Sequence, residues 1–574
     1  MKRAAAAVPH TAALLLALLA VSANGVAAAT YSGFIPMVTD SAAVFSVPTV
    51  AQPLYVKPIL DPTFGTVVTR ISDDAGMPLG ALGASWGSVA RHRYSKVQPW
   101  NSTMTLLSLD NNGTGYTPVL LDGSTYQPVQ GPCPNYDRWD YRWHPKLVHS
   151  REQINVNQAG TELMWFDVVN CVKTRSWPLP IVSDYGIGSG EGNVSNSGRF
   201  VVIANQSQMV VVDMDPPAIV APPYPYQRIG PVYTFDPCSL DVAQPNVGHI
   251  AHVSISPSGR YIDVKYGRDT DTTACDTLCD MHRIFEVDTS LVIRPHNMAD
   301  GSLRCGSFAA RPNGWIFPLK HADMTHDIDG DNEDILIGGR SCPGSTLGHV
   351  VKVRLLDGQV TALTNPVNEP AYADGSARSL LRPGWFYVSY SRDPKYAGFR
   401  FWGEVVAVRT DGSQQVQRFG HYHSTAAVYK AEAQAVPSPD GRRVVFGSDW
   451  ADHAVWPGGT APAGARAFVF DAREGATLAA PPPEKPHGLA LGLMSPNPTS
   501  GGLLVRFAIP EPRPAALELF DLAGRRLRVV DAGTLGVGEH VLELDPDRSL
   551  QAGIYFVTLT DGRERKNVRA VVIH

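Results

Sequence analysis

The stretch Ser438-Pro439-Asp440-Gly441-Arg442, followed by the apolar residues Val444-Val445-Phe446, is the strongest indicator of the fold class of this chain. Proline and aspartate favour the start of a turn, glycine adopts the positive φ that the turn requires, and β-branched residues continue as a strand. This order of residues predicts a β-hairpin. The same order occurs in residues 195–203 and again in residues 256–264, each time with an apolar strand after the glycine and arginine.

The three hairpins recur at a regular spacing. The first two begin 61 residues apart, at Ser195 and Ser256, and the third begins at Ser438, about three such intervals later. A fixed period is the signature of a repeat architecture. The turn and the strand after it resemble the hairpin of TolB-type and WD-like β-propeller repeats, and this resemblance implies an all-β propeller. Residues 30–480 have room for roughly seven blades of this length.

The composition of the 574-residue chain agrees with many short strands. Glycine and proline are frequent, with 52 and 46 residues, and charged residues make up only 18%, which favours strands joined by tight turns over helices. The net charge is −5 and the basic residues do not cluster. Nucleic acid is therefore not an expected partner.

The N-terminal residues predict export. Lys2 and Arg3 precede an apolar run at 12–21, and small residues follow it. This order is typical of a secretory signal peptide, which we place at 1–29. No later apolar run is long enough to span a bilayer, so no transmembrane segment is expected.

The C-terminal residues carry three motifs in a fixed order. Pro496-Asn497-Pro498 comes first, a strand and the turn Ala523-Gly524-Arg525 follow, and Ala552-Gly553-Ile554-Tyr555-Phe556-Val557 comes near the end. Together they resemble the C-terminal sorting domain of type IX secretion cargo; the related module of flagellar hook-capping proteins is the alternative. The resemblance implies a small immunoglobulin-like β-sandwich at 491–574, behind a proline-rich linker at 481–490. It also implies the type IX machinery as a partner, and a protein that is secreted or on the outer-membrane surface of a Gram-negative bacterium.

The cysteines fit an exported protein, because disulfides form and persist outside the cytosol. The chain has seven, an odd number, which leaves one unpaired. Cys275 and Cys279 are close enough in sequence to pair, although spacing alone does not decide the connectivity.

Histidines mark the first candidate site. His421 and His423 lie on one face if their segment is a strand, because side chains alternate with period two. Two imidazoles on one face are half of a metal site, and ordinary hydrogen-bonded histidines are the alternative. His252 precedes the second hairpin, and His321 precedes an acidic turn. We expect all four histidines to point into one central channel and to hold a divalent ion there.

The region around His421-Tyr422-His423 and the strand at 443–450 resembles oligogalacturonate lyases. This resemblance implies a divalent ion, usually manganese, held by histidines and one glutamine, and β-elimination from a uronate with a general base that is often histidine. The sequence departs from the family pattern at one point. Arg418 stands three residues before His421, and the nearest glutamine is Gln417.

An acidic segment is a second candidate for a metal. Asp327, Asp329 and Asp331 alternate around a glycine, and oxygen ligands in this arrangement suit calcium. The segment resembles the calcium loops of integrin-type propellers, with a solvated acidic turn as the alternative.

An aromatic segment at 136–144 contains Arg138 and Arg142. Arginine pairs with carboxylates through two parallel hydrogen bonds, so these two residues are candidates for binding an acidic polysaccharide. The alternative is packing of arginine on aromatic rings inside the fold.

Two functional hypotheses follow. The chain is a metal-dependent polysaccharide lyase, or it is a non-catalytic extracellular propeller that binds glycan or protein. The sequence contains no Walker loop, no GxSxG elbow and no HExxH motif. We therefore expect no nucleotide cofactor and none of the common hydrolase mechanisms.

Overall fold

The computed structural model describes a chain built almost entirely of β-strands. It covers residues 37–573 apart from 113–117, 139, 185, 189, 216–227, 236–249, 267–281, 297, 299–314, 317–318, 329–332, 341–348, 426–428, 451–464, 473–488, 494–496, 500–502, 512, 536–537 and 546–549. The expected signal peptide lies outside the described residues. Within them, no helix has the length and apolar character needed to cross a bilayer.

Thirty strands form the first and larger group of sheets. In chain order they are β1 (Ile59–Leu60), β2 (Val67–Arg70), β3 (Val89–Arg91), β4 (Leu106–Asn112), β5 (Val119–Asp122), β6 (Pro128–Gln130), β7 (Asp140–Trp143), β8 (Glu152–Val156), β9 (Glu162–Asp167), β10 (Val172–Pro178), β11 (Phe200–Ala204), β12 (Gln208–Asp213), β13 (Arg228–Ile229), β14 (Tyr233–Thr234), β15 (Ile250–Ile255), β16 (Tyr261–Tyr266), β17 (His282–Val287), β18 (Ile293–Pro295), β19 (Trp315–Ile316), β20 (Leu319–His326), β21 (Asp334–Arg340), β22 (Val350–Arg354), β23 (Val360–Ala362), β24 (Tyr372–Ser376), β25 (Trp385–Tyr390), β26 (Glu404–Arg409), β27 (Val416–His421), β28 (Val436–Pro437), β29 (Arg443–Ser448) and β30 (Ala465–Asp471). Short 3-10 helices interrupt them at η1 (Leu147–His149), η4 (Pro394–Tyr396) and η5 (Tyr429–Ala431).

These strands make seven antiparallel blades within the described residues. Blade 1 is β3–β6, blade 2 is β7–β10, blade 3 is β11–β14, blade 4 is β15–β19, blade 5 is β20–β23 and blade 6 is β24–β27. Blade 7 combines β28, β29 and β30 with β2 and β1, and a short parallel pairing of β3 with β30 joins it to blade 1. The fold is a β-propeller, as the hairpin repeats predict.

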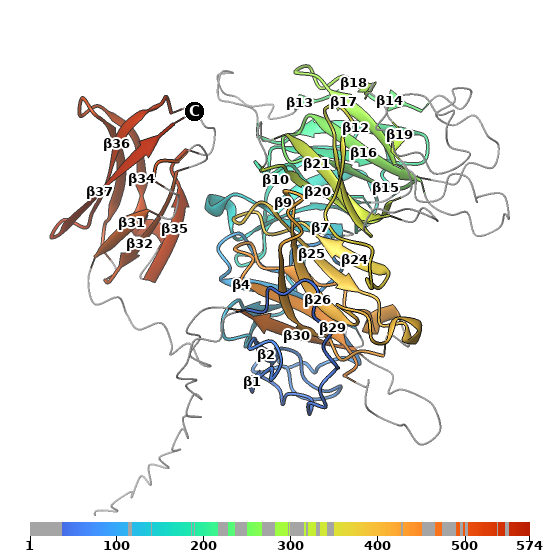
Figure 1. Cartoon of the computed structure of the whole chain (residues 1–574). Helices are drawn as coiled ribbons and strands as arrows, with labels where there is room; N and C mark the ends of the chain where they lie inside the picture. The colour runs from blue at the N-terminus through green and yellow to red at the C-terminus, as the bar shows by residue number, and fades with distance from the viewer. Residues whose placement is uncertain are drawn as a thin grey trace, which may run out of the picture.

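Blade 7 closes the ring with strands from both ends of the propeller. β2 pairs antiparallel with β30, so that Val67 lies opposite Asp471 and Arg70 lies opposite Phe468. In Figure 1 the blue β2 accordingly lies beside the orange-brown β30. This pairing hydrogen-bonds residues about 400 positions apart and leaves no break between the first and last blades.

The three repeated hairpins have the predicted turn conformation. Gly198, Gly259 and Gly441 have φ values of 69°, 82° and 66°. The amide of Gly441 donates to the carbonyl of Ser438 at 2.7 Å, and the other two glycines make the corresponding bond to Ser195 and Ser256. Each hairpin therefore ends the innermost segment of its blade and starts the next strand.

Apolar side chains fill the spaces between blades. Val253 and Ile255 of β15 pack with Val202 and Val211 of blade 3, whereas Ile284 of β17 packs with Leu319 and other residues of blade 5. The blades are thus buried on both faces. Polar residues on their innermost strands are buried along the axis of the ring.

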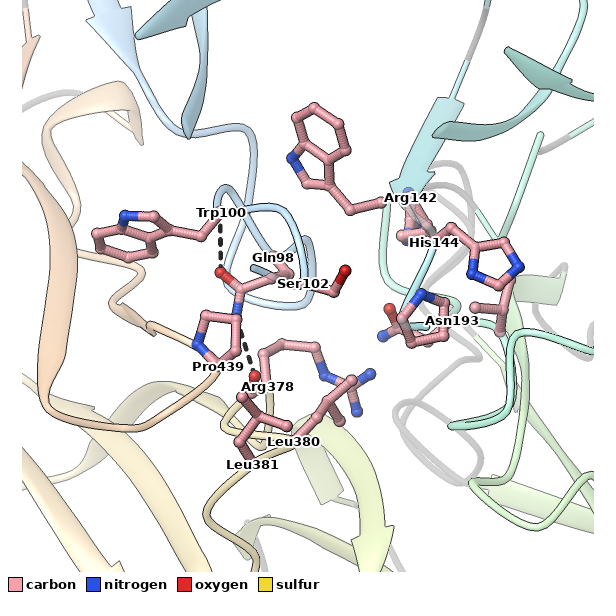
Figure 2. A pocket seen from close by; sticks show the side chains of 13 residues that line it. Gln98, Trp100, Ser102, Arg142, His144, Asn193, Arg378, Leu380, Leu381 and Pro439 are labelled. Carbon is pink, nitrogen blue, oxygen red and sulfur yellow. Dashed lines mark hydrogen bonds between the residues drawn. The ribbon is translucent and has the colours of Figure 1, made fainter. Parts of the chain in front are cut away.

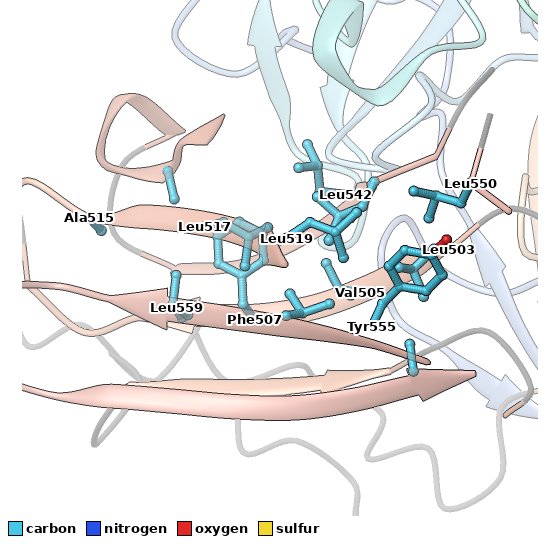
Figure 3. Close-up of a cluster of buried hydrophobic side chains, with 14 of the residues drawn as sticks. Leu503, Val505, Phe507, Ala515, Leu517, Leu519, Leu542, Leu550, Tyr555 and Leu559 are labelled. Atoms are coloured by element: carbon cyan, nitrogen blue, oxygen red, sulfur yellow. The ribbon is translucent and has the colours of Figure 1, made fainter. Parts of the chain in front are cut away.

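The C-terminal strands form two smaller antiparallel sheets. One contains β31 (Ala490–Leu493), β32 (Leu504–Ile509) and β35 (Gly538–Glu543), and the other contains β33 (Ala516–Asp521), β34 (Arg526–Asp531), β36 (Gly553–Thr560) and β37 (Arg565–Val572), with the 3-10 helix η6 (Ala532–Leu535) between β34 and β35. Figure 3 shows side chains of both sheets meeting in one core, with Val505 and Phe507 from β32 against Leu517, Leu519 and Leu559 from the other sheet. This packing is a β-sandwich, as the sequence predicts for this part of the chain.

One disulfide lies in the described residues, between Cys133 and Cys171. It connects the segment after blade 1 to the β9–β10 turn of blade 2. The other five cysteines, Cys275 and Cys279 among them, lie outside the described residues.

Candidate functional site

Three polar residues occupy the same place relative to the repeated hairpins. Glu191, His252 and Gln434 each stand four residues before the first serine of a hairpin. Because each hairpin ends the innermost segment of its blade, these residues occupy equivalent positions in blades 3, 4 and 7. The repeat therefore brings one polar side chain from each of these three blades to the central channel.

Contacts between distant blades show where the channel lies. Tyr94, which follows β3 in blade 1, bonds through its hydroxyl to Nδ1 of His321 in blade 5 at 2.7 Å. Lys96 of blade 1 bonds through Nζ to Oδ1 of Asp374 in blade 6 at 3.0 Å. Blades that are not neighbours around a ring meet only at its axis, so these four side chains lie in the channel.

Three successive innermost strands have an irregularity beside these residues. The pairing register shifts between Ile250 and His252 in β15, between Lys320 and Asp323 in β20, and between Tyr372 and Asp374 in β24. His321 also has φ at 44°, in the left-handed region. Bulges re-aim side chains and are frequent next to active sites, and backbone strain of this kind is retained where surrounding structure enforces it.

The electrostatic field in the channel is set by several buried basic groups. Burial raises the pKa of Glu191, but the nearby His252, Lys265 and further basic groups outweigh this effect and lower that pKa to about 2. Burial likewise raises the pKa of Asp374, but the nearby Lys96 and His321 outweigh this effect and lower that pKa. A carboxyl group at this point of the channel is therefore held ionised.

Tyr94 is protonated in this environment. Burial, together with nearby carboxylates, raises its pKa well above the usual range. Its hydroxyl lies 2.7 Å from Nδ1 of His321, and this hydrogen bond orients the imidazole ring in the channel.

His252, Asp263 and His282 form the one group of three metal-ligating side chains that the described residues bring within 4.8 Å. All three lie on the same face of blade 4, because His252 and His282 both pair with Lys265 and Asp263 stands two residues from Lys265. Both oxygens of Asp263 lie 2.9 Å from Nδ1 of His282, and Nε2 of His282 lies 3.0 Å from the carbonyl oxygen of Leu319.

Both ring nitrogens of His282 have oxygen atoms as hydrogen-bond neighbours in this arrangement. Nε2 of His252 lies 3.6 Å from Asp263, a carboxylate already bonded to His282. The three side chains form a buried carboxylate–histidine network, and they are the candidate metal site among the described residues.

The four histidines predicted to share the channel divide into two pairs. His252 and His321 lie in the channel, but His421 ends β27, the strand of blade 6 farthest from the axis in its sheet. The ring of His421 packs edge-on against Phe64, and that of His423 packs against Trp450. The structure therefore does not bring the four predicted histidines together, because His421 ends an outer strand and His423 lies just beyond it.

Of the two predicted arginines, Arg142 is enclosed by the fold and Arg138 is half-buried. Arg142 is 3% exposed and its guanidinium bonds to Asp140 and to the carbonyls of Tyr141, Ile187 and Gly192. Arg138 stacks on the rings of Tyr136 and Tyr141. Packing inside the fold, the alternative considered from the sequence, describes both residues, and Arg142 has no accessible donor for a substrate carboxylate.

The predicted calcium loop is only partly within the described residues, because Asp329 and Asp331 lie outside them. Asp327 is buried, and both of its carboxylate oxygens accept hydrogen bonds from Nζ of Lys352, at 3.0 and 2.9 Å. This carboxylate is directed to a lysine of β22. The expectation that Asp327 is a calcium ligand does not agree with this pairing.

Sequence reasoning missed Tyr94, Lys96, Glu191 and Asp374. The offset of four residues before Ser195 is a signal that identifies Glu191, since the same offset leads to His252. Tyr94, Lys96 and Asp374 carry no such signal, because blades 1 and 6 lack the repeated hairpin sequence.

The ring of blades and its polar channel define the chain as a β-propeller protein. No family model matches the chain, and no curated protein matches it. Among solved structures, an oligogalacturonate lyase in complex with manganese is similar over 76% of this chain and 97% of that chain, at 11% identity and a TM-score of 0.41. The Cps50 (Swd1) β-propeller domain of Myceliophteria thermophila is similar over 66% and 97%, at 10% identity and a TM-score of 0.33. Propellers of unrelated activities share similarity at this level, so it does not identify the reaction of this chain.

Proposed function

We propose that the propeller channel is a catalytic site that cleaves an acidic polysaccharide by β-elimination. The observation that carries this proposal is the row of three bulges in β15, β20 and β24, which lie beside His252, His321 and Asp374. Bulges re-aim side chains, and here three successive innermost strands each have one beside a polar residue.

The chemistry of the channel supports an elimination. The basic groups that lower the pKa of Glu191 to about 2, His252 and Lys265 among them, are candidates for pairing with the carboxylate of a uronate. In the elimination a base removes the proton next to that carboxylate, the electron pair forms the carbon–carbon double bond, and the bond to the glycosidic oxygen breaks. His321, oriented by Tyr94, is the group to which we assign proton donation to the departing oxygen.

The test is incubation of the purified chain with polygalacturonate, with the ultraviolet absorbance of the unsaturated product as the readout. His321→Ala is expected to lower the rate by about 100-fold or more. His149→Ala is the control, because His149 lies in η1 of blade 2 and bonds to Glu152. Absence of unsaturated product from a panel of uronate polymers contradicts the elimination.

Metal analysis separates this reaction from the manganese-assisted elimination that the sequence resemblance implies. Stoichiometric manganese that is lost in His252→Ala, together with activity abolished by a chelator, favours the metal-assisted reaction. Activity that survives the chelator favours proton transfer by the side chains alone.

A non-catalytic propeller is the second candidate. Several channel charges neutralise each other, as in the pair of Lys96 with Asp374 and the pair of Arg378 with Asp323. Such pairs favour a rigid binding surface for glycan or protein. Saturable binding of uronate oligomers without product formation supports this candidate.

We also propose that the chain is exported by the type IX system through its C-terminal β-sandwich. The three C-terminal motifs and the signal-peptide pattern support this, and the disulfide between Cys133 and Cys171 is compatible with an oxidising compartment. Deletion of 491–574 is expected to retain the protein in the periplasm of a type IX host. Unchanged secretion of the deletion variant contradicts the proposal.

A further inference from the structure

A pocket lies at the end of the channel where the innermost strands turn into hairpins. It has a volume of about 530 Å³, its open mouth included, and its walls come from blades 1, 2, 3, 6 and 7. Asn193 and Arg378 in its wall stand two and four residues beyond Glu191 and Asp374 along their chains. At about 3.3 Å per residue, this places the pocket roughly 7–13 Å further down the axis than the polar site.

The hairpin of blade 6 makes one side of the pocket apolar. Leu380 and Leu381 stand where the other hairpins carry proline, asparagine, serine or aspartate, residues that favour exposed turns. Both leucines are half-buried and line the pocket, together with Pro439 of the next hairpin. The amide of Leu381 donates to the carbonyl of Pro439 at 2.8 Å, which holds the two hairpins side by side.

The charged residues in the pocket wall are neutralised. Arg378 bonds through Nε and Nη2 to the carboxylate of Asp323, at 3.0 and 2.8 Å. Arg142 bonds to Asp140 at 2.7 Å. The pocket therefore has apolar walls and no uncompensated charge from these residues, so an anionic or cationic ligand gains no ionic partner here.

Asn193 supplies an unused hydrogen-bond donor. It is 6% exposed, and its Nδ2 has no hydrogen-bond partner among the described residues. Figure 2 shows Asn193 on the wall opposite Trp100, on the same side as the guanidinium group of Arg378. A buried donor without a partner costs about 1–3 kcal/mol, and a ligand that bears an acceptor removes this cost.

We propose that this pocket is a second binding site, distinct from the polar channel, for an uncharged apolar molecule that carries a carbonyl-type hydrogen-bond acceptor. The apolar walls bind the body of the ligand, and Nδ2 of Asn193 binds its acceptor. This site binds an uncharged apolar ligand, whereas a uronate polymer is anionic and polar. The proposal does not depend on the elimination proposed above.

The test uses the full chain and Nile red, an uncharged apolar dye with a carbonyl group. We expect a saturable increase in fluorescence that corresponds to one site per chain. Leu381→Glu places a charge in the pocket and is expected to weaken binding at least about tenfold. Leu356→Glu is the matched control, because Leu356 is an exposed leucine in the turn after β22, away from the pocket.

A second variant tests the donor. Asn193→Leu is expected to weaken Nile red several-fold and to leave binding of pyrene, which has no acceptor, unchanged. Circular dichroism checks that each variant is folded. Absence of saturable dye binding, equal binding by Leu381→Glu and Leu356→Glu, or stronger binding of an anionic naphthalene sulfonate than of Nile red each overturns the proposal.

Discussion

Oε2 of Glu191 lies 3.4 Å from Nδ1 of His252, and neither atom has a hydrogen-bond partner among the described residues. The two residues stand at equivalent positions of neighbouring blades, four residues before the hairpin serine. The repeat therefore places a carboxylate directly against an imidazole inside the channel. The contribution of such a pair to the stability of the fold depends on the charge of each partner.

Glu191→Gln is expected to change the dependence of stability on pH. The pKa of Glu191 is lowered in the folded chain to about 2, from 4.5 for the free group. Its contribution to stability is thus complete above about pH 4.5 and is lost as the pH falls through about 2. We expect the difference in unfolding free energy between the wild type and Glu191→Gln to shrink by on the order of 2 kcal/mol over this range.

Urea unfolding followed by tryptophan fluorescence measures this difference. Glu564→Gln, at an exposed turn of the sandwich, is the control. A difference that stays constant between pH 5 and pH 2 contradicts the assigned environment of Glu191.

Arg418→Ala is expected to destabilise the outer edge of blade 6. Arg418 is completely buried, bonds Glu404 through Nε at 2.8 Å, and donates to the carbonyls of Asp40 and Ala43. Its removal leaves the buried Glu404 carboxylate unpaired, which costs about 3–5 kcal/mol. We also expect protease to cleave residues 37–45 more rapidly, because this segment loses its attachment to β27.

Arg409→Ala provides the comparison for Arg418. Arg409 pairs with Asp411 on the surface at 3.2 Å, and an exposed pair contributes about 0–1 kcal/mol. Chemical denaturation and limited proteolysis of both variants test the prediction. Equal effects of the two substitutions would show that the buried pair contributes nothing beyond a surface pair.

Gly441→Ala is expected to be more harmful than Gly524→Ala. Both glycines have positive φ, at 66° and 78°, so both substitutions carry the backbone cost of about 1 kcal/mol. A Cβ on Gly441 would lie 2.2 Å from the hydroxyl of Tyr387, whereas a Cβ on Gly524 meets nothing within 4 Å. Thermal unfolding should therefore show a larger loss for Gly441→Ala, and equal losses are incompatible with the packing of this hairpin.

Replacement of Cys133 and Cys171 by serine is expected to lower stability by about 2–4 kcal/mol, because the crosslink restricts the unfolded chain. The two cysteines are 38 residues apart in sequence. Thermal unfolding with and without reductant is the measurement. The reductant should destabilise the wild type and leave the double serine variant unchanged, and an unchanged wild type contradicts a stabilising bond.

The channel could be predicted only in part. His252 and His321 can be identified from their place before a hairpin and before an acidic turn, and Glu191 stands at the offset that identifies His252. Tyr94 of blade 1 bonds to His321, which is 227 residues away in sequence. Asp374 of blade 6 bonds to Lys96, which is 278 residues away. No local pattern encodes contacts of this range.

The hairpins, the repeat and the all-β class follow from the order of residues alone. Turn chemistry is local: Gly441 adopts positive φ and bonds Ser438 three residues earlier, so a short stretch of sequence is sufficient to predict it. Which strands lie at the axis, in contrast, depends on tertiary packing. His421 ends an outer strand and His423 follows it with a φ of 49°, whereas His252 lies in an inner strand. The order of strands in a blade depends on how whole blades pack around the ring, and that information is distributed over the chain.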